Sequence, residues 1–423
     1  MDFTQFVSSS YTSYHAVANV AKYLEEKGFI ELNESDTFSL VKGGRYFVIR
    51  DGSALAAFVV GENSYNIVAC HTDSPSFKIK GNPLIKDALY VKLNTESYGG
   101  GLYYSFLDRP LKLAGRAILL NRKTGEIQSK LVKSDFNVII PSLAIHMNRE
   151  ANKSLALNPQ IDMLPLVSTD GDVDVLKAVV GEIPTDFEMI ESDIYVTPNV
   201  EPFESGIKNE FLSSPRLDDL CGVYGAIEAL IRCSCNSTAI AVCFDNEEVG
   251  SSTKQGAGGT FLKHLISRIS TSMGVNDQLK NGLNSSFMVS MDNAHAVHPN
   301  HAEKNDPTNK PTMNGGVVIK HHANQNYTSD AVSSAVIKYI FSKANVKYQD
   351  FYMRSDMACG GTLGAISSGQ LSIRSVDIGL AQLAMHSAVE TMGASDIDTL
   401  VCGLTAFYNS KINTINYDKI SII

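Results

Sequence analysis

Residues 65–75 read YNIVACHTDSP, a short apolar run that ends directly at a histidine. Two later runs have the same form: residues 238–245 read TAIAVCFD, and residues 287–292 read FMVSMD. Short apolar runs flanked by helical segments are typical of buried strands in an α/β sheet. Because each run ends at an acidic or imidazole side chain, we expect the functional site to lie at the strand ends of this sheet.

Segments with helical periodicity surround these runs. Near the N-terminus, 3–27 has helical spacing with a polar break at 8–13 that supplies an N-cap for a helix from Tyr14. Four further helices are predicted at Asp219–Cys233, Gly258–Ser272, Ser329–Ala344 and Ala394–Lys411.

The middle of the chain has a different pattern. From about Pro83 to Leu212, short apolar runs alternate with turns, and long helical periodicity is largely absent. A chain of 423 residues also exceeds the usual size of one domain. We therefore predict an α/β domain formed by residues 1–82 and 210–423, interrupted by a β-rich domain at residues 83–209.

The composition excludes several classes of function. A net charge of −9, without a cluster of Lys or Arg, argues against nucleic acid as a partner. No run approaches the ~20 apolar residues of a membrane span, and the N-terminal residues lack the regions of a signal peptide. The seven cysteines are scattered, without a CxxC pair, and are predicted to be reduced. We expect a cytoplasmic protein that does not bind membranes.

Five side chains predict a metal site. His71, Asp292 and one of the neighbours Glu247 and Glu248 lie at or just after strand ends, where ligands bind in open α/β sheets. Asp218 precedes a predicted helix, and His386 lies in the segment AMHSAVE. These nitrogen and oxygen donors, without a thiolate, suit Zn²⁺, Mn²⁺ or Co²⁺.

The number of candidate ligands predicts two ions. One tetrahedral catalytic zinc needs three protein ligands and an open position. One bridging carboxylate with two further ligands for each ion uses all five candidates and places the ions roughly 3.5–4 Å apart, with a water between them. Two cations that share a water make hydroxide available near neutral pH and polarise a carbonyl.

Hydrolysis also needs a group that moves a proton from the water to the leaving amine. Glu247 and Glu248 are neighbours, and adjacent side chains in extended chain point to opposite sides. We expect one to be a ligand and the other the base, and the spacing leaves both assignments open. Asp73, two residues after His71, is predicted to accept the second imidazole N–H of His71.

Five motifs, in order along the chain, resemble the M18 aspartyl aminopeptidases. They are HTDSP (71–75), SPRLDDL (214–220), DNEEVGS (245–251), DNAHAVHPN (292–300) and QLAMHS (382–387). The resemblance implies an α/β/α catalytic domain, similar to other co-catalytic di-zinc exopeptidases, with an inserted β-rich domain that mediates dimer contacts. It further implies a homododecamer built from dimers, and hydrolysis of N-terminal residues from peptides with a preference for Asp or Glu.

The resemblance also assigns the metal ligands. Asp218 would bridge two ions, most simply zinc. His71 and Asp292 would complete one site, and Glu248 and His386 would complete the other.

The remaining roles are implied in the same way. Glu247 would be the general base, and Asp73 would orient His71. His146 in AIHMNR (144–149) would enter the active site of a neighbouring subunit and stabilise the developing oxyanion. Three residues would line the substrate site: Lys320, Tyr327 and His295.

Two other functions share parts of this pattern. A di-metal amidohydrolase acting on N-acyl amino acids would use the same metal set, but it would accept a blocked N-terminus. A non-catalytic oligomeric scaffold would not need the complete set of ligands and base. The sequence has no HExxH, GxSxG elbow or P-loop, which disfavours single-zinc proteases, serine hydrolases and nucleotide enzymes.

Overall fold

The computed structural model describes the chain except for residues 88, 235, 276–281 and 417–418. Its largest element is a mixed sheet with the strand order β1-β2-β3-β13-β4-β14-β18-β16-β17. The strands are β1 (Ile30–Glu31), β2 (Arg45–Arg50), β3 (Ala54–Val59), β13 (Ser237–Phe244), β4 (Glu62–His71), β14 (Phe287–Met291), β18 (Arg374–Gly379), β16 (Val317–His321) and β17 (Tyr348–Tyr352). The three apolar runs are β4, β13 and β14, which are parallel neighbours at the centre.

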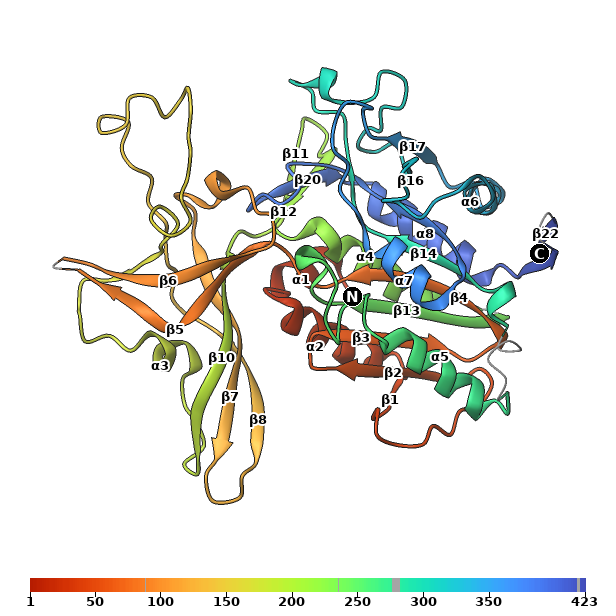
Figure 1. Cartoon of the computed structure of the whole chain (residues 1–423), viewed down its shortest axis with the longest axis horizontal. Helices are drawn as coiled ribbons and strands as arrows, with labels where there is room; N and C mark the ends of the chain where they lie inside the picture. The colour runs from red at the N-terminus through yellow and green to blue at the C-terminus, as the bar shows by residue number, and fades with distance from the viewer. Residues whose placement is uncertain (88, 235, 276–281, 417–418) are drawn as a thin grey trace.

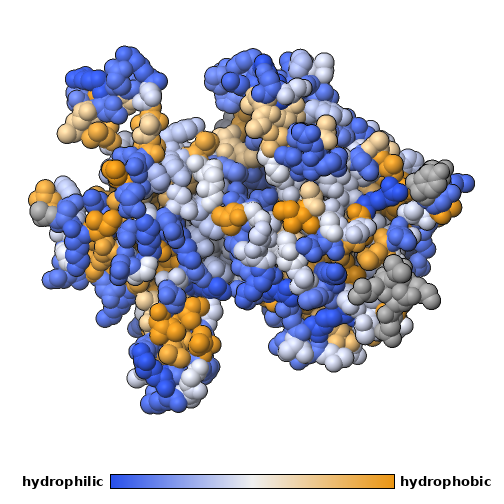
Figure 2. Space-filling view, in the orientation of Figure 1, coloured by the Kyte–Doolittle hydropathy of each residue, from blue (hydrophilic) through white to orange (hydrophobic). Residues whose placement is uncertain are grey.

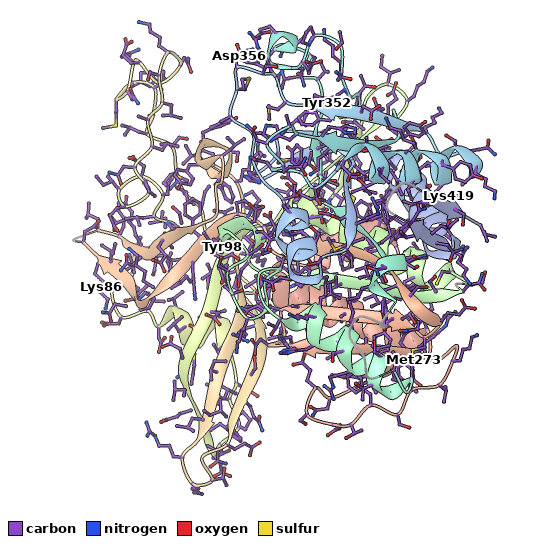
Figure 3. All side chains as sticks on the ribbon, turned by 45° about the vertical axis from the view of Figure 1, so that its right-hand side comes forward. Lys86, Tyr98, Met273, Tyr352, Asp356 and Lys419 are labelled. Carbon is purple, nitrogen blue, oxygen red and sulfur yellow. The ribbon has the colours of Figure 1, made fainter. Side chains whose placement is uncertain are left out.

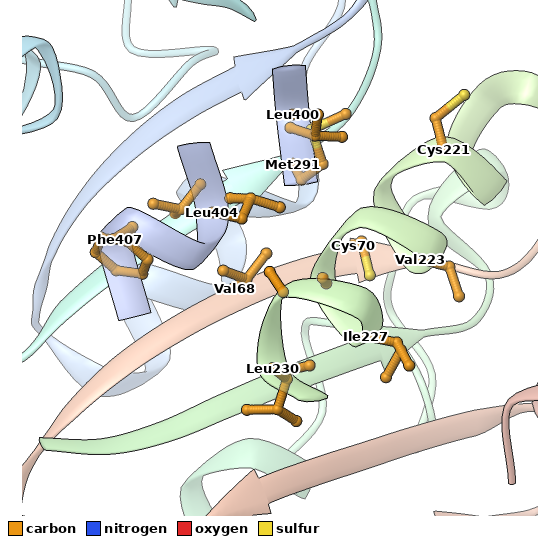
Figure 4. Packing of buried hydrophobic residues seen from close by; sticks show 14 of the residues in the cluster. Val68, Cys70, Cys221, Val223, Ile227, Leu230, Met291, Leu400, Leu404 and Phe407 are labelled. Carbon is orange, nitrogen blue, oxygen red and sulfur yellow. The ribbon is translucent and has the colours of Figure 1, made fainter. Parts of the chain in front are cut away.

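Helices cover both faces of this sheet (Figure 1). One face is covered by α1 (Phe3–Ser9), α2 (Ser13–Glu26), α4 (Leu217–Arg232), α6 (Ala331–Lys343) and α8 (Asp396–Asn409). The other face is covered by α5 (Phe261–Ser272) and α7 (Leu363–Leu371). Side chains alternate along each strand, so Val68 and Cys70 of β4 pack under α4 and α8, while Ile67 and Ala69 face α5. Figure 4 shows α4 and α8 closing over Val68 and Cys70. The predicted α/β/α arrangement is confirmed.

A second, six-stranded sheet is inserted between β4 and β12, with the strand order β8-β7-β10-β5-β6-β9. Its strands are β5 (Ser76–Lys86), β6 (Val91–Tyr98), β7 (Leu111–Asn121), β8 (Ile127–Lys133), β9 (Leu166–Ser168) and β10 (Phe187–Pro198). With α3 (Val175–Val180), this sheet encloses a core of its own around Phe77, Leu113 and Ile194. The predicted β-rich insertion is therefore present, on the left in Figure 1. Strand β5 crosses the expected boundary between residues 82 and 83, and the division of the chain at 82 and 209 stays a prediction.

A small five-stranded sheet, β11-β12-β20-β19-β15, lies beside the strand ends. Its strands are β11 (Phe203–Ser205), β12 (Phe211–Ser214), β20 (Glu390–Gly393), β19 (Ala381–Leu383) and β15 (Ala294–His295). A final hairpin pairs β21 (Ile412–Asn416) with β22 (Lys419–Ile422). In the described ranges, Cys70, Cys221, Cys243, Cys359 and Cys402 are free thiols. Within those ranges, no helix combines the length and the apolar character that crossing a bilayer requires.

Candidate metal centre

Three neighbouring strands bring most of the site together. Strand β4 ends at His71, Asp292 follows β14, and the turn Glu247–Val249 comes shortly after β13. Because the three strands are parallel, their carboxyl ends meet at one edge of the sheet. Asn246 has a left-handed backbone (φ 61°), which turns the chain so that Glu247 and Glu248 face this edge.

Two further residues reach this edge from other elements. Asp218 lies at the start of α4, where the backbone is not helical (φ −84°, ψ 111°) and the Asp218–Asp219 peptide bond is cis. His386 lies in the turn between β19 and β20, with φ 65°. The five predicted ligands therefore converge from five separate segments of the chain.

The ligand atoms form two groups that share Asp218. His71, Asp218 and Asp292 each offer one atom within 4.8 Å of the others, and so do Asp218, Glu248 and His386. Nε2 of His71 lies 3.7 Å from Oδ1 of Asp218, and Nε2 of His386 lies 3.8 Å from Oδ2. These distances exceed those of hydrogen bonds, and they leave room for an ion at about 2 Å from each atom.

The second ring nitrogen of each histidine has a defined partner. Nδ1 of His71 lies 3.1 Å from the backbone carbonyl of Asp73, and Nδ1 of His386 lies 3.1 Å from the backbone carbonyl of Gly100. Because a carbonyl oxygen only accepts hydrogen bonds, Nδ1 carries the proton in both rings, and Nε2 keeps the lone pair that a metal binds. The Asp73 carboxylate, predicted to be this acceptor, lies farther away, with Oδ1 at 3.4 Å from His71.

Buried oxygens without partners show that these residues fit a cation. Oδ1 of Asp218 and Oε1 of Glu248 have no hydrogen-bond partner among the described residues, although both are buried. Leaving a buried acceptor unpaired costs about 1–3 kcal/mol. A divalent cation would pair both oxygens, and its charge would offset the repulsion between the carboxylates.

The pKa values reflect the same crowding of acidic groups. Burial, assisted by Asp292 and Asp73, raises the pKa of Glu247 to about 8. Burial also raises the pKa of Asp292 to about 6, although the charge of Lys320 opposes this shift. A carboxylic acid with a pKa close to neutrality is suited to both taking up and releasing a proton.

A cavity of about 220 Å³ opens over the ligands. Besides the ligands and Glu247, it is lined by the three residues assigned to the substrate: Lys320, Tyr327 and His295. Lys320 is buried, donates to the carbonyl of Asn293 at 3.1 Å, and lies 5.0 Å from the centre of the Tyr327 ring. His295 is exposed. The cavity therefore combines the candidate ligands, a proton carrier and a basic side chain.

His146 lies away from this cavity. It is exposed in the long loop between β8 and β9, which projects from the inserted sheet at the upper left of Figure 1. It is not among the residues that line the cavity over the ligands. The geometry of the individual chain thus gives His146 no contact with its own site.

Sequence reasoning did not assign three residues that hold the site together. Glu390 accepts hydrogen bonds from the backbone amides of Asp218, at 3.0 Å, and His386, at 2.7 Å. Asn293 donates to the carbonyl of Leu217 at 3.0 Å, and Tyr98 donates to Asp73 at 2.7 Å. Asn293 lies within the motif at 292–300 and Glu390 lies close after His386, which was the available signal, whereas Tyr98 lies far from the five motifs.

Comparison with known proteins shows which family the whole chain resembles. Residues 6–408 match the family described as "Aminopeptidase I zinc metalloprotease (M18)". The chain is 45% identical to a probable M18 family aminopeptidase 2 of Clostridium novyi, over 92% of this chain and 94% of that protein. A similar protein of Clostridium acetobutylicum is 41% identical, over 96% and 97% of the two chains.

Solved structures have the same fold. The cryo-EM structure of the Ape4 and Nbr1 complex contains a chain that is 32% identical, with a TM-score of 0.90 over 96% of this chain and 84% of that chain. The S. cerevesiae mApe1 dodecamer is 27% identical, with a TM-score of 0.83 over 96% and 95% of the two chains. Since the family model and the relatives each span most of its length, the chain belongs to the M18 family of metallo-aminopeptidases.

Proposed function

We propose that this aminopeptidase binds two divalent metal ions, zinc being the expected metal, and prefers peptides with N-terminal Asp or Glu. The observation that carries the two-metal proposal is the position of Asp218, whose two carboxylate oxygens each face a different histidine. His71 and Asp292 would complete one site, and Glu248 and His386 the other. The two bound cations would lower the pKa of a water molecule and polarise the scissile carbonyl.

Glu247 is the proposed proton carrier. It lines the cavity but belongs to neither group of ligand atoms, whereas Glu248 belongs to one of them. A carboxylate in this position, beside the candidate ligands, would take a proton from the attacking water and return it to the leaving amine. This assigns the two neighbouring glutamates the different roles that their sequence positions left open.

Lys320 is the proposed partner of an acidic N-terminal side chain. Lys320 lines the cavity together with the candidate ligands, and Tyr327 and His295 line it too. A buried charge-assisted hydrogen bond to a carboxylate contributes about 1.5–3 kcal/mol. That contribution is large enough to favour Asp and Glu over uncharged residues.

Assembly is part of the same proposal. A dodecamer is found for the similar mApe1, and the insertion carries exposed apolar side chains, among them Leu89, Met147 and Ile161. Figure 2 shows apolar patches on this part of the surface. We propose that the inserted domain, residues 83–209, forms dimers that assemble into a dodecamer. In that assembly, His146 would stabilise the developing oxyanion in a neighbouring subunit.

A pair of glutamate variants tests the proposal. Glu247→Gln should retain two metal ions per chain by elemental analysis and lose turnover by about 100- to 10,000-fold. Glu248→Gln is the matched variant and should lose metal as well as turnover. Near-normal activity of Glu247→Gln would exclude Glu247 as the base. Cleavage of substrates with a blocked N-terminus would instead favour the amidohydrolase alternative.

A further inference from the structure

The inserted sheet reaches the metal centre through Tyr98, Gly99 and Gly100, which follow one another at the end of β6. Tyr98 lies where the inserted sheet meets the α/β part of the molecule (Figure 3). Each of the three residues contacts a different component of the site, and none of them is itself a candidate ligand.

The hydroxyl group of Tyr98 has a fixed orientation. It accepts a hydrogen bond from Nδ2 of Asn246 at 2.8 Å and donates to Oδ2 of Asp73 at 2.7 Å. The carbonyl oxygen of the Asn246 side chain accepts from Thr253 and Gln255, both at 3.0 Å, so its NH₂ group must face Tyr98. The Tyr98 proton is therefore directed at Asp73.

Asp73, oriented in this way, contacts residues on both sides of the metal centre. Its Oδ1 accepts from the backbone amide of Glu247 at 3.1 Å, and its Oδ2 accepts from the amide of Glu248 at 3.2 Å. Its Oδ1 also lies 3.4 Å from Nδ1 of His71. A rotation of the Asp73 carboxylate would therefore shift His71 and the turn that carries Glu247 and Glu248.

Gly99 and Gly100 contact the side of the site that contains Glu248 and His386. The carbonyl of Gly100 accepts from Nδ1 of His386 at 3.1 Å, which aims Nε2 of that ring at Asp218 and Glu248. Gly99 has φ 71°, and a Cβ there would lie 3.1 Å from Cβ of Glu248. Glycine at this position lets the backbone pass close to the ligand.

We propose that Tyr98 is a positioning residue for the metal centre, and that the segment 98–100 makes both metal sites depend on the inserted sheet. The inference rests on the proposed metal ligands. Partners of metal ligands that fix their orientation change metal affinity by about 10- to 100-fold when removed. Tyr98 acts one step further out, through Asp73, so we expect an effect of about tenfold.

The test is Tyr98→Phe in the full-length protein, which removes the hydroxyl and keeps the ring that packs on Tyr195 with centroids 5.5 Å apart. Zn²⁺ affinity is measured by titration against a competing chelator, and the visible spectrum of the Co²⁺-loaded protein reports ligand geometry. We expect about tenfold weaker Zn²⁺ binding and a changed Co²⁺ spectrum. Tyr195→Phe is the matched control and should leave both unchanged.

A second variant guards against a general effect on folding. Gly99→Ala disturbs the same segment at its middle residue, because φ 71° strains a residue with a Cβ and that Cβ would press on Glu248, and should weaken Zn²⁺ binding too. Thermal unfolding in EDTA shows whether each variant is folded. If Tyr98→Phe binds Zn²⁺ with wild-type affinity and spectrum, the positioning role is wrong. If the wild-type protein itself binds no Zn²⁺, the proposed function is wrong, and this inference fails with it.

Discussion

The ammonium group of Lys320 lies 3.5 Å from Oδ2 of Asp292, one of the proposed ligands. The same ammonium group donates to the backbone carbonyl of Asn293, and the side chain is only 2% exposed. Lys320 therefore does more than offer a charge to the substrate. It also stabilises the ionised form of Asp292, whose pKa burial would otherwise raise further.

Lys320→Ala should for this reason have two effects on catalysis. The loss of support for Asp292 should lower kcat/KM for all substrates. The loss of a charge-assisted hydrogen bond should lower kcat/KM further for substrates with N-terminal Asp or Glu. The loss for these substrates should exceed the loss for Ala and Leu by a factor of about ten or more. The measurement is kcat/KM for a panel of aminoacyl substrates, with Lys338→Ala as the control. An equal loss on all substrates would refute a role in selectivity.

Asp218→Asn should remove both metal ions. Both groups of ligand atoms contain Asp218, so its replacement weakens two sites, whereas His386→Ala disturbs one. Elemental analysis after dialysis is expected to give less than one ion per chain for Asp218→Asn and about one for His386→Ala. One tightly held ion in Asp218→Asn would show that this carboxylate does not serve both sites.

Glu390→Gln should loosen the centre without touching a ligand side chain. The Glu390 carboxylate accepts from the amides of Asp218 and His386 through different oxygens. Glutamine would turn an NH₂ group toward one of those amides and leave it unpaired, at a cost of about 1–3 kcal/mol. Calorimetry should show a lower Tm, and chelator competition should show faster metal loss. The exposed Glu204→Gln is the control, and equal behaviour of the two variants would exclude this role.

Local sequence patterns predict the parts of the fold that are periodic and buried. The three central strands and four long helices are such segments, and the structure contains all of them. The pattern did not reveal α7, where LGAISSGQL includes two glycines and two serines and has little separation of polar from apolar positions. It also did not reveal β17, an edge strand that reads YQDFY. Short, partly polar elements take their structure from tertiary packing, which a local pattern does not contain.

The same distinction holds at the site. Three of the five proposed ligands, His71, Asp292 and one of the neighbours Glu247 and Glu248, were predictable because strand ends collect at one edge of a parallel sheet. The residues that hold them were not, because their contacts join distant parts of the chain. Glu390 lies 172 residues from Asp218, and Tyr98 lies 148 residues from Asn246. Nor does adjacency reveal which of Glu247 and Glu248 faces His386, since that depends on the turn after β13.

Asp193 lies at the junction of the two sheets, and it should make the stability of the protein depend on pH. It pairs with Lys78 at 2.7 Å and Arg116 at 2.9 Å, and it accepts from Tyr14 of α2 at 3.2 Å. Burial alone would raise the pKa of Asp193, but the two cations lower it below its ordinary value. Its contribution to stability is therefore complete above the unfolded pKa of about 3.9 and is lost as the pH falls through the lowered folded pKa.

Asp193→Asn should consequently lower Tm at pH 7, and the difference from wild type should shrink as the pH falls below about 4. Thermal unfolding is measured in EDTA, so that loss of metal at low pH does not contribute. Asp186→Asn, which breaks an exposed pair with Lys123, is the control and should change Tm little. A difference that stays constant from pH 7 to pH 3 would contradict this account.

Mixed assemblies should reveal whether His146 acts between subunits. We expect His146→Ala and Glu247→Gln each to be nearly inactive alone, since one lacks an oxyanion donor and the other lacks the base. In an assembly formed from equal amounts, about a quarter of the sites would combine an intact Glu247 with a His146 from a neighbour. Activity should therefore reappear when the two chains are co-expressed, and size exclusion with mass analysis confirms that the assemblies are mixed. Mixed assemblies that stay inactive would show that His146 does not act in a neighbouring subunit, and near-normal activity of His146→Ala alone would place His146 outside the reaction.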